Sequence, residues 1–270
     1  MTHRTRAGIV LFVLAQGLAG CGGSGSGSTP STPSLVQSPP QSVPPVNAGV
    51  RGNVVDTADR PIGGALVEVV DGPRAGMSAI SNAKGEFTFA ERFDDLTLFR
   101  ATHEGHIAAT VSWRNGLPNR PWMLLALGVL APPVTIAGNY TLTFIADGAC
   151  AAALPADLRT RTYAATITDM SHPNCPAGTR FTIVASGAEF DAVFNWFSVG
   201  VAGDYLAFWL GDEHLIEKLA ANRYLELMGS AEAVTTSGAS TISASFDGTF
   251  RYSGAPVCAS RNHQLVLTRR

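Results

Sequence analysis

The four cysteines of this 270-residue chain are its side chains with the most distinctive possible reactions. A thiolate can act as a nucleophile, form a disulfide or bind a metal ion. Cys21 follows a short apolar segment near the amino terminus, whereas Cys150, Cys175 and Cys258 lie in the second half of the chain. The segment around each thiol therefore decides which of these reactions is open to it.

Residues 1–20 have the parts of a secretory signal. Arg4 and Arg6 give a positive start, residues 7–18 are apolar, and small residues lead into Cys21. A stretch of about twelve apolar residues is too short for a transmembrane helix, which needs about twenty. These features also fit an ordinary cleaved signal or a short membrane anchor, and the residues that lead into Cys21 bear on the choice.

Leu18-Ala19-Gly20-Cys21 resembles the end of a bacterial lipoprotein signal peptide. The resemblance implies cleavage before Cys21, a diacylglyceryl group on its thiol and an acyl chain such as palmitate on its amino group. Two or three acyl chains anchor a protein stably, because each buried methylene contributes about 0.8 kcal/mol. Gly22 stands where the inner-membrane retention signal of lipoproteins has Asp, so we expect an envelope protein anchored in the outer membrane.

Residues 21–48 are predicted to form a disordered tether. From residue 22 onward, 19 of these 27 residues are Gly, Ser, Thr or Pro, and none is charged or aromatic. Such a composition cannot bury enough apolar surface to offset its ordering entropy. A Pro-rich ligand for a recognition domain is the alternative interpretation.

The rest of the chain has the composition of a globular protein. Hydrophobic residues make up 46% of the sequence, and the mean hydropathy is +0.15. Loss of Arg4 and Arg6 with the signal takes the formal charge from −2 to −4, and the sequence has no dense basic patch. This balance argues against nucleic acid as a partner. About 220 residues are enough for two domains, which we place at 49–133 and 134–270.

Residues 49–133 alternate short apolar strands with turns, which predicts a β-sandwich. Its motifs resemble the carboxypeptidase regulatory-like family, which implies a transthyretin-like sandwich that is often grouped with carbohydrate-binding folds and accompanies another domain. Ser81 replaces the usual Thr, and His106 replaces the usual aromatic residue. A fold-level analogy does not establish sugar binding. The matching segments are Val54-Val55-Asp56, Pro61-Ile62-Gly63-Gly64-Ala65-Leu66-Val67, Ser81-Asn82-Ala83-Lys84-Gly85-Glu86-Phe87 and Glu104-Gly105-His106.

Residues 134–270 predict an antiparallel β-barrel or a strongly curved sandwich with one short helix. The helix is expected at 212–220, with Leu215, Ile216 and Leu219 on one face. Gly138-Asn139-Tyr140 resembles the Gly-x-Trp start of lipocalin-like barrels, which implies room for one small ligand. The strand candidates are 138–144, 161–168, 181–185, 190–197, 203–210, 223–229, 240–250 and 264–268.

The expected barrel suggests a disulfide between Cys150 and Cys258. Cys150 follows the first strand candidate and Cys258 precedes the last, and these strands become neighbours when a barrel closes. An exported protein lies in a compartment that permits disulfides. A bridge from Cys150 to Cys175 across a shorter loop is the alternative, and either pairing leaves one cysteine over.

The remaining polar motifs predict no catalytic residue, metal or cofactor. His103 and His106 are three residues apart at a strand end, where alternation points them to opposite faces, whereas a zincin needs two His four apart on a helix. Acidic turns at 56–59 and 94–95 are more often solvated than bound to Ca²⁺. The sequence has no Gly-x-Ser-x-Gly, phosphate-binding Gly-rich loop or Cys-x-x-Cys. We therefore expect that the protein is not an enzyme.

Aromatic side chains supply the candidate ligand-binding residues, which are Trp196, Tyr205 and Trp209. Exposed rings would stack on sugars or line an apolar pocket, and buried rings would belong to the core. Two hypotheses follow. The first is a lipid-anchored, non-enzymatic binding or adhesion module for a glycan or small apolar ligand. The second is a structural or assembly accessory with a filled barrel that binds another envelope protein.

Overall fold

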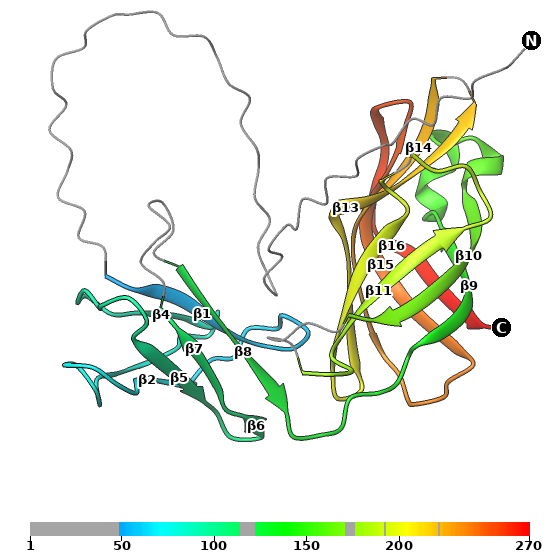
Figure 1. Ribbon diagram of the computed structural model, residues 1–270. Coiled ribbons are helices and arrows are strands. Elements are labelled where there is room, and N and C mark those ends of the chain that lie inside the picture. Colours follow the sequence, from blue (N-terminus) through cyan, green and yellow to red (C-terminus); the bar gives the residue numbers. More distant parts are fainter. Residues whose placement is uncertain (1–48, 114–121, 171–175, 192, 221) are drawn as a thin grey trace, which may run out of the picture.

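The computed structural model describes residues 49–113, 122–170, 176–191, 193–220 and 222–270, which are coloured in Figure 1. The predicted signal, the lipidation residue Cys21, the predicted tether and Cys175 lie outside these residues. The described chain confirms the all-β prediction, because strands are joined only by loops and two short 3-10 helices. Within it, no helix is long and apolar enough to cross a bilayer.

The first folded unit is a β-sandwich of two four-stranded sheets. One sheet has the strand order β4-β1-β8-β6, and the other has the order β3-β2-β5-β7. β1 pairs in parallel with β8, and the other pairings are antiparallel. The strands are β1 (Arg51–Asp56), β2 (Leu66–Val69), β3 (Ser78–Ile80), β4 (Glu86–Thr88), β5 (Leu98–Thr102), β6 (His106–Ile107), β7 (Ala109–Ser112) and β8 (Trp122–Val129).

Alternating apolar side chains fill the space between the two sheets. Val67 and Val69 of β2 are fully buried, and Phe89 meets Phe99 edge to face with the ring centroids 5.5 Å apart. Ser81 is also buried: its hydroxyl donates to the carbonyl oxygen of Ile62 and accepts from the amide of Ala65. The serine therefore satisfies backbone groups that would otherwise be buried without partners.

The second folded unit is a closed antiparallel barrel of eight strands, seen at the right of Figure 1. Consecutive strands are neighbours, and β16 returns to pair with β9, with Leu267 opposite Leu142. The strands are β9 (Gly138–Ile145), β10 (Thr160–Asp169), β11 (Arg180–Ser186), β12 (Trp196–Ala202), β13 (Tyr205–Ala220), β14 (Arg223–Val234), β15 (Thr241–Tyr252) and β16 (Ala255–Arg269). The 3-10 helices η1 (Gly148–Ala152) and η2 (Ala156–Leu158) lie between β9 and β10.

Side chains of the barrel's own strands fill its interior. The ring of Phe144 lies 5.4 Å from that of Phe246 and 6.3 Å from that of Phe197. A barrel of eight strands is just wide enough for side chains to fill. The large buried rings are Tyr140, Phe144, Tyr163, Phe181, Phe197, Phe208, Phe246 and Phe250, each at most 2% exposed.

The helix expected at 212–220 is wrong, because this segment continues β13. Leu215 lies opposite Leu227 of β14, and Lys218 lies opposite Tyr224. The apolar spacing that resembled one helix face is compatible with a strand, since Leu215 belongs to the barrel core and the backbone of Ile216 forms hydrogen bonds with Asp191 and Phe194. Pairing with β14 outweighs weak local helix propensity, although the register shifts between Leu210 and Leu215 and between Lys218 and Ala220.

The strand expected at 190–197 begins later, at Trp196. Residues before it fold over one end of the barrel, where the amide of Asp191 donates to the carbonyl oxygen of Ile216 at 3.0 Å. The ring of Phe190 packs against Tyr163 with 5.3 Å between centroids. This segment therefore helps to close the barrel end.

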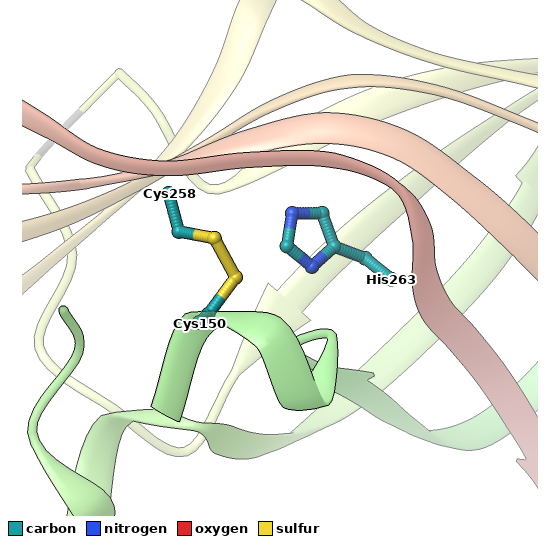
Figure 2. Close-up of side chains that lie close together, drawn as sticks. All are labelled: Cys150, Cys258 and His263. Carbon is teal, nitrogen blue, oxygen red and sulfur yellow. A yellow bond between two sulfur atoms is a disulfide. The ribbon is translucent and has the colours of Figure 1, made fainter. Parts of the chain in front are cut away.

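The predicted disulfide between Cys150 and Cys258 is confirmed as a pair, with the two Cα atoms 5.6 Å apart. Cys150 lies in η1 just after β9, and Cys258 lies within β16, the strand that pairs with β9 (Figure 2). The alternative partner, Cys175, lies outside the described residues. The bridge clamps the strand pair that closes the barrel.

Loss of the disulfide is expected to destabilise the barrel strongly. The bridge joins residues 108 apart in the sequence, and a loop of that length predicts a loss of about 4 to 5 kcal/mol in the free energy of unfolding. Urea unfolding of the oxidised chain and of a Cys150→Ser, Cys258→Ser variant measures the difference. Cys175→Ser is the control, and a similar loss in that variant would contradict the pairing.

Candidate functional site

Two of the three predicted ligand-binding aromatics meet the sandwich on the outside of the barrel. Tyr205 and Trp209 lie on β13, on the face opposite the buried Leu206 and Phe208, and both are partly buried. Trp196 lies on the outer face of β12 and is also partly buried. None of the three rings points into the barrel core.

The turn at residues 56–61, here called the docking turn, covers part of this outer face. Asp56 at its start is buried, and its carboxylate accepts from the backbone amides of Ala58 at 2.8 Å and Arg60 at 3.0 Å. Its second oxygen accepts from Nε of Arg60 at 2.6 Å. Asp59 adopts a left-handed conformation with φ of 58°, which Asp tolerates better than most residues. The acidic turn is thus a rigid structural element.

Small residues let the docking turn approach the barrel backbone closely. The Thr57 hydroxyl donates to the carbonyl oxygen of Val201 at 2.5 Å, and Ala58 packs against Ala202 and Ala207. At Gly200, a Cβ atom would lie 2.8 Å from the Thr57 carbonyl oxygen and 3.0 Å from the Ala58 Cα atom. Only glycine fits at this position without a shift of backbone.

Two arginine side chains lie over the two aromatic rings. The guanidinium of Arg60 from the docking turn lies 4.0 Å from the ring centroid of Tyr205. Arg180 of β11 lies 4.8 Å from the ring centroid of Trp209 and forms an ion pair with Asp59 at 3.2 Å. Such cation–π contacts gain strength when they are partly desolvated. The Arg60–Tyr205 contact joins the sandwich to the barrel, and Trp209 packs against the cluster that Ala58 forms with two barrel alanines. Trp196 remains a candidate ligand contact.

Burial dominates the electrostatics of this joint. Burial raises the pKa of Asp59, and the Arg180 guanidinium only partly opposes that effect. Burial likewise raises the pKa of Tyr205, with a further contribution from its hydrogen bond to Glu232. The phenol therefore stays protonated under the Arg60 guanidinium.

A second buried polar cluster closes the barrel end. Glu217 is 4% exposed and receives two hydrogen bonds from Arg161, one of them from Nε at 2.9 Å. The hydroxyl of Tyr163 donates to the same carboxylate at 2.9 Å, and burial followed by the Glu217 charge raises the pKa of this phenol. Because Arg161 and Tyr163 both donate to the Glu217 carboxylate, the buried charge is paired within the cluster, which is the arrangement of a structural ion pair. No local sequence pattern indicates this cluster, because Tyr163 and Arg161 are 54 and 56 residues away from Glu217 in the sequence.

The ring of His263 lies beside the disulfide (Figure 2). The potential metal-ligand atoms of Cys150, Cys258 and His263 lie within 4.8 Å of one another. The two sulfurs are joined in a disulfide, however, so they are not thiolate ligands. Nδ1 of His263 accepts from the amide of Asp147 at 2.9 Å, which places its proton on the other nitrogen. Nε2 is buried, and no group among the described residues forms a hydrogen bond of ordinary geometry with it. Burial lowers the pKa of His263.

His103 and His106 lie together, contrary to the expectation that they face opposite sides of a strand. Their Nδ1 atoms are 3.2 Å apart. The alternation rule fails because the chain turns between them, at Gly105 with φ of 76°. Sequence reasoning therefore missed a polar pair that its own motif contained.

No protein-family model matches this chain, and a search of curated proteins finds no relative. The family resemblances of the sequence therefore rest on their motifs alone.

Replacing Gly200 is expected to loosen the joint between the two folded units. Gly200→Ala forces a Cβ atom against the docking turn, and overpacking of this kind costs about 1 to 3 kcal/mol. Urea unfolding, tryptophan emission and limited proteolysis measure the loss of packing at Trp209. Gly211→Ala is the matched control, because a Cβ atom there meets nothing within 4 Å. Equal stability of the two variants would contradict the close approach.

His263 is expected to make the barrel less stable in mild acid. Its folded-state pKa is lowered by burial, so the unfolded chain binds a proton at pH values where the folded chain does not. Stability therefore falls as the pH drops from 6.5 toward the lowered pKa, by at most about 1.4 kcal/mol per pH unit. Urea unfolding between pH 7 and pH 5 compares the wild type with His263→Gln. Parallel curves would contradict the assignment.

Proposed function

We propose that this chain is a lipid-anchored, non-enzymatic module of a bacterial envelope that binds another envelope protein through the outer face of its sandwich. The observation that carries the proposal is the distribution of apolar side chains. The barrel's own rings fill its interior, whereas several large apolar side chains of the sandwich face solvent. These exposed side chains are Leu66, Val70, Ile80, Leu96, Ile107 and Trp122.

Leu66 and Ile80 form an exposed apolar pair on one sheet of the sandwich. They are direct cross-strand partners on β2 and β3 and are 38% and 62% exposed. Glu68 and Arg100 form an ion pair at 2.7 Å on the same sheet, which supplies a polar border. β3 is an edge strand, and such an edge can accept a strand from a partner. An apolar centre, a polar border and a free edge together favour a protein partner.

The competing hypothesis is a glycan or small apolar ligand. Support for it is weaker, because Tyr205 and Trp209 already contact Arg60 and Arg180. Of the three predicted ligand-binding aromatics, Trp196 is outside these two contacts. Anchoring through acylated Cys21 belongs to both hypotheses and places the folded units at the membrane surface.

A photo-reactive phenylalanine analogue in place of Ile80 is expected to crosslink to one specific envelope protein in the native host. Val234 is the matched control, because it is an exposed aliphatic side chain on the barrel, 70% exposed. An Ile80→Asp substitution should weaken the partner's binding by at least about tenfold, as loss of a central apolar contact does. The crosslinked band is identified by mass spectrometry, and affinity is then measured with the purified partner.

A Cys21→Ser variant separates the anchor from the binding surface. We expect it to lose membrane association and the crosslink in cells while the purified protein keeps its affinity for the partner. Equal crosslinking from positions 80 and 234 would contradict the proposed surface. A stoichiometric glycan or lipid in native mass spectra of the purified chain would favour the competing hypothesis.

A further inference from the structure

The turn from His103 to His106 brings three electron-rich atoms together. Nδ1 of His103 and Nδ1 of His106 are 3.2 Å apart. The backbone carbonyl oxygen of Glu104 lies 2.9 Å from the first nitrogen and 3.0 Å from the second. The three atoms form a nearly equilateral triangle at the turn between β5 and β6 of the sandwich.

Hydrogen bonds alone satisfy this triangle poorly. If both nitrogens donated to the Glu104 carbonyl, two N–H groups would crowd one another across 3.2 Å. If only one nitrogen donates, to the carbonyl oxygen or to the other nitrogen, the second nitrogen still faces the carbonyl oxygen with no hydrogen between them, since a neutral imidazole has one donor and one acceptor nitrogen. A cation is attracted to all three atoms at once.

The backbone holds the triangle in place. The turn connects β5 to β6, and the amide of His106 donates to the carbonyl oxygen of His103 at 3.2 Å. Gly105 supplies the left-handed residue that the turn requires, and its carbonyl oxygen accepts from the amide of Leu130 at 3.1 Å. The end of β8 thus fixes the turn, and the two histidine rings are only partly exposed.

We propose that this turn binds a divalent first-row transition-metal ion through Nδ1 of His103, Nδ1 of His106 and the carbonyl oxygen of Glu104, with water completing the coordination. Metal–nitrogen and metal–oxygen bonds are about 2.0 to 2.2 Å long. Two ligands at about 2.05 Å are therefore about 2.9 Å apart at a right angle and about 3.3 Å apart at the tetrahedral angle. The observed edges of 2.9, 3.0 and 3.2 Å fall in this interval.

The donor set indicates which ions bind. Imidazole suits Cu²⁺, Ni²⁺ and Zn²⁺, and the stability order of such complexes places Cu²⁺ first. Ca²⁺ and Mg²⁺ prefer several oxygen ligands, which this turn does not present. The inference is independent of the proposed function, because His106 and the Leu66–Ile80 pair lie on different sheets of the sandwich.

The test is a Cu²⁺ titration of the full chain, purified in detergent with an affinity tag that contains no histidine. We expect one equivalent of Cu²⁺ to bind with a paramagnetic resonance spectrum that shows two nitrogen ligands. His103→Ala and His106→Ala should each weaken this binding at least about tenfold and leave one nitrogen in the spectrum. Zn²⁺ should compete for the site, and Mg²⁺ should not.

Glu104→Gln is the matched control, because it keeps the carbonyl oxygen and removes only the side-chain charge. Its Cu²⁺ affinity should equal that of the wild type, and a tenfold loss would overturn the carbonyl assignment in favour of the carboxylate. Wild-type affinity and a two-nitrogen spectrum in both histidine variants would overturn the site altogether. Thermal unfolding of each variant checks that the sandwich remains folded, and the two histidine positions test the site separately if one variant unfolds.

Discussion

Pairing of β9 with β16 is the constraint on which the rest of the barrel depends. It joins the two ends of a segment of more than a hundred residues, and the disulfide between Cys150 and Cys258 lies directly beside it. Once the ring of strands is closed, the sheet has no free edge, and the inward side chains must fill a cylinder of fixed width. Large rings do so. Closure therefore moves any recognition of partners to the outside of the molecule.

Much of the barrel could be predicted from local sequence. Tyr140, Leu142 and Phe144 alternate with polar residues, and the same rule locates most other strands. The disulfide followed from topology, because neighbouring first and last strands bring their flanking cysteines together. The segment 212–220 could not be predicted in this way. Its apolar spacing suits a helix locally, and only its pairing with the following strand β14 decides otherwise.

The candidate sites were less predictable, because residues that are far apart in the sequence meet there and no local pattern indicates such contacts. Asp59 and Arg180 are 121 residues apart, so nothing near either residue indicates that they meet. The aromatic pattern did identify Tyr205 and Trp209, but it could not distinguish a ligand platform from a contact within the chain. At His103 and His106, strand alternation does not hold, because β5 ends at Thr102 and Gly105, with φ of 76°, turns the chain between the two histidines. A single turn residue thus reversed the expected geometry.

The joint between sandwich and barrel combines two interactions with different roles. Close packing of Ala58 against Ala202, Ala207 and the bare backbone of Gly200 removes apolar surface from water, which stabilises the contact. The ion pair of Asp59 with Arg180 contributes less, because the raised pKa of Asp59 means that desolvation costs more than the attraction returns. Its planar geometry instead orients Arg180 over Trp209. Close packing of the small residues therefore stabilises the joint more than this ion pair does, and the ion pair selects one orientation.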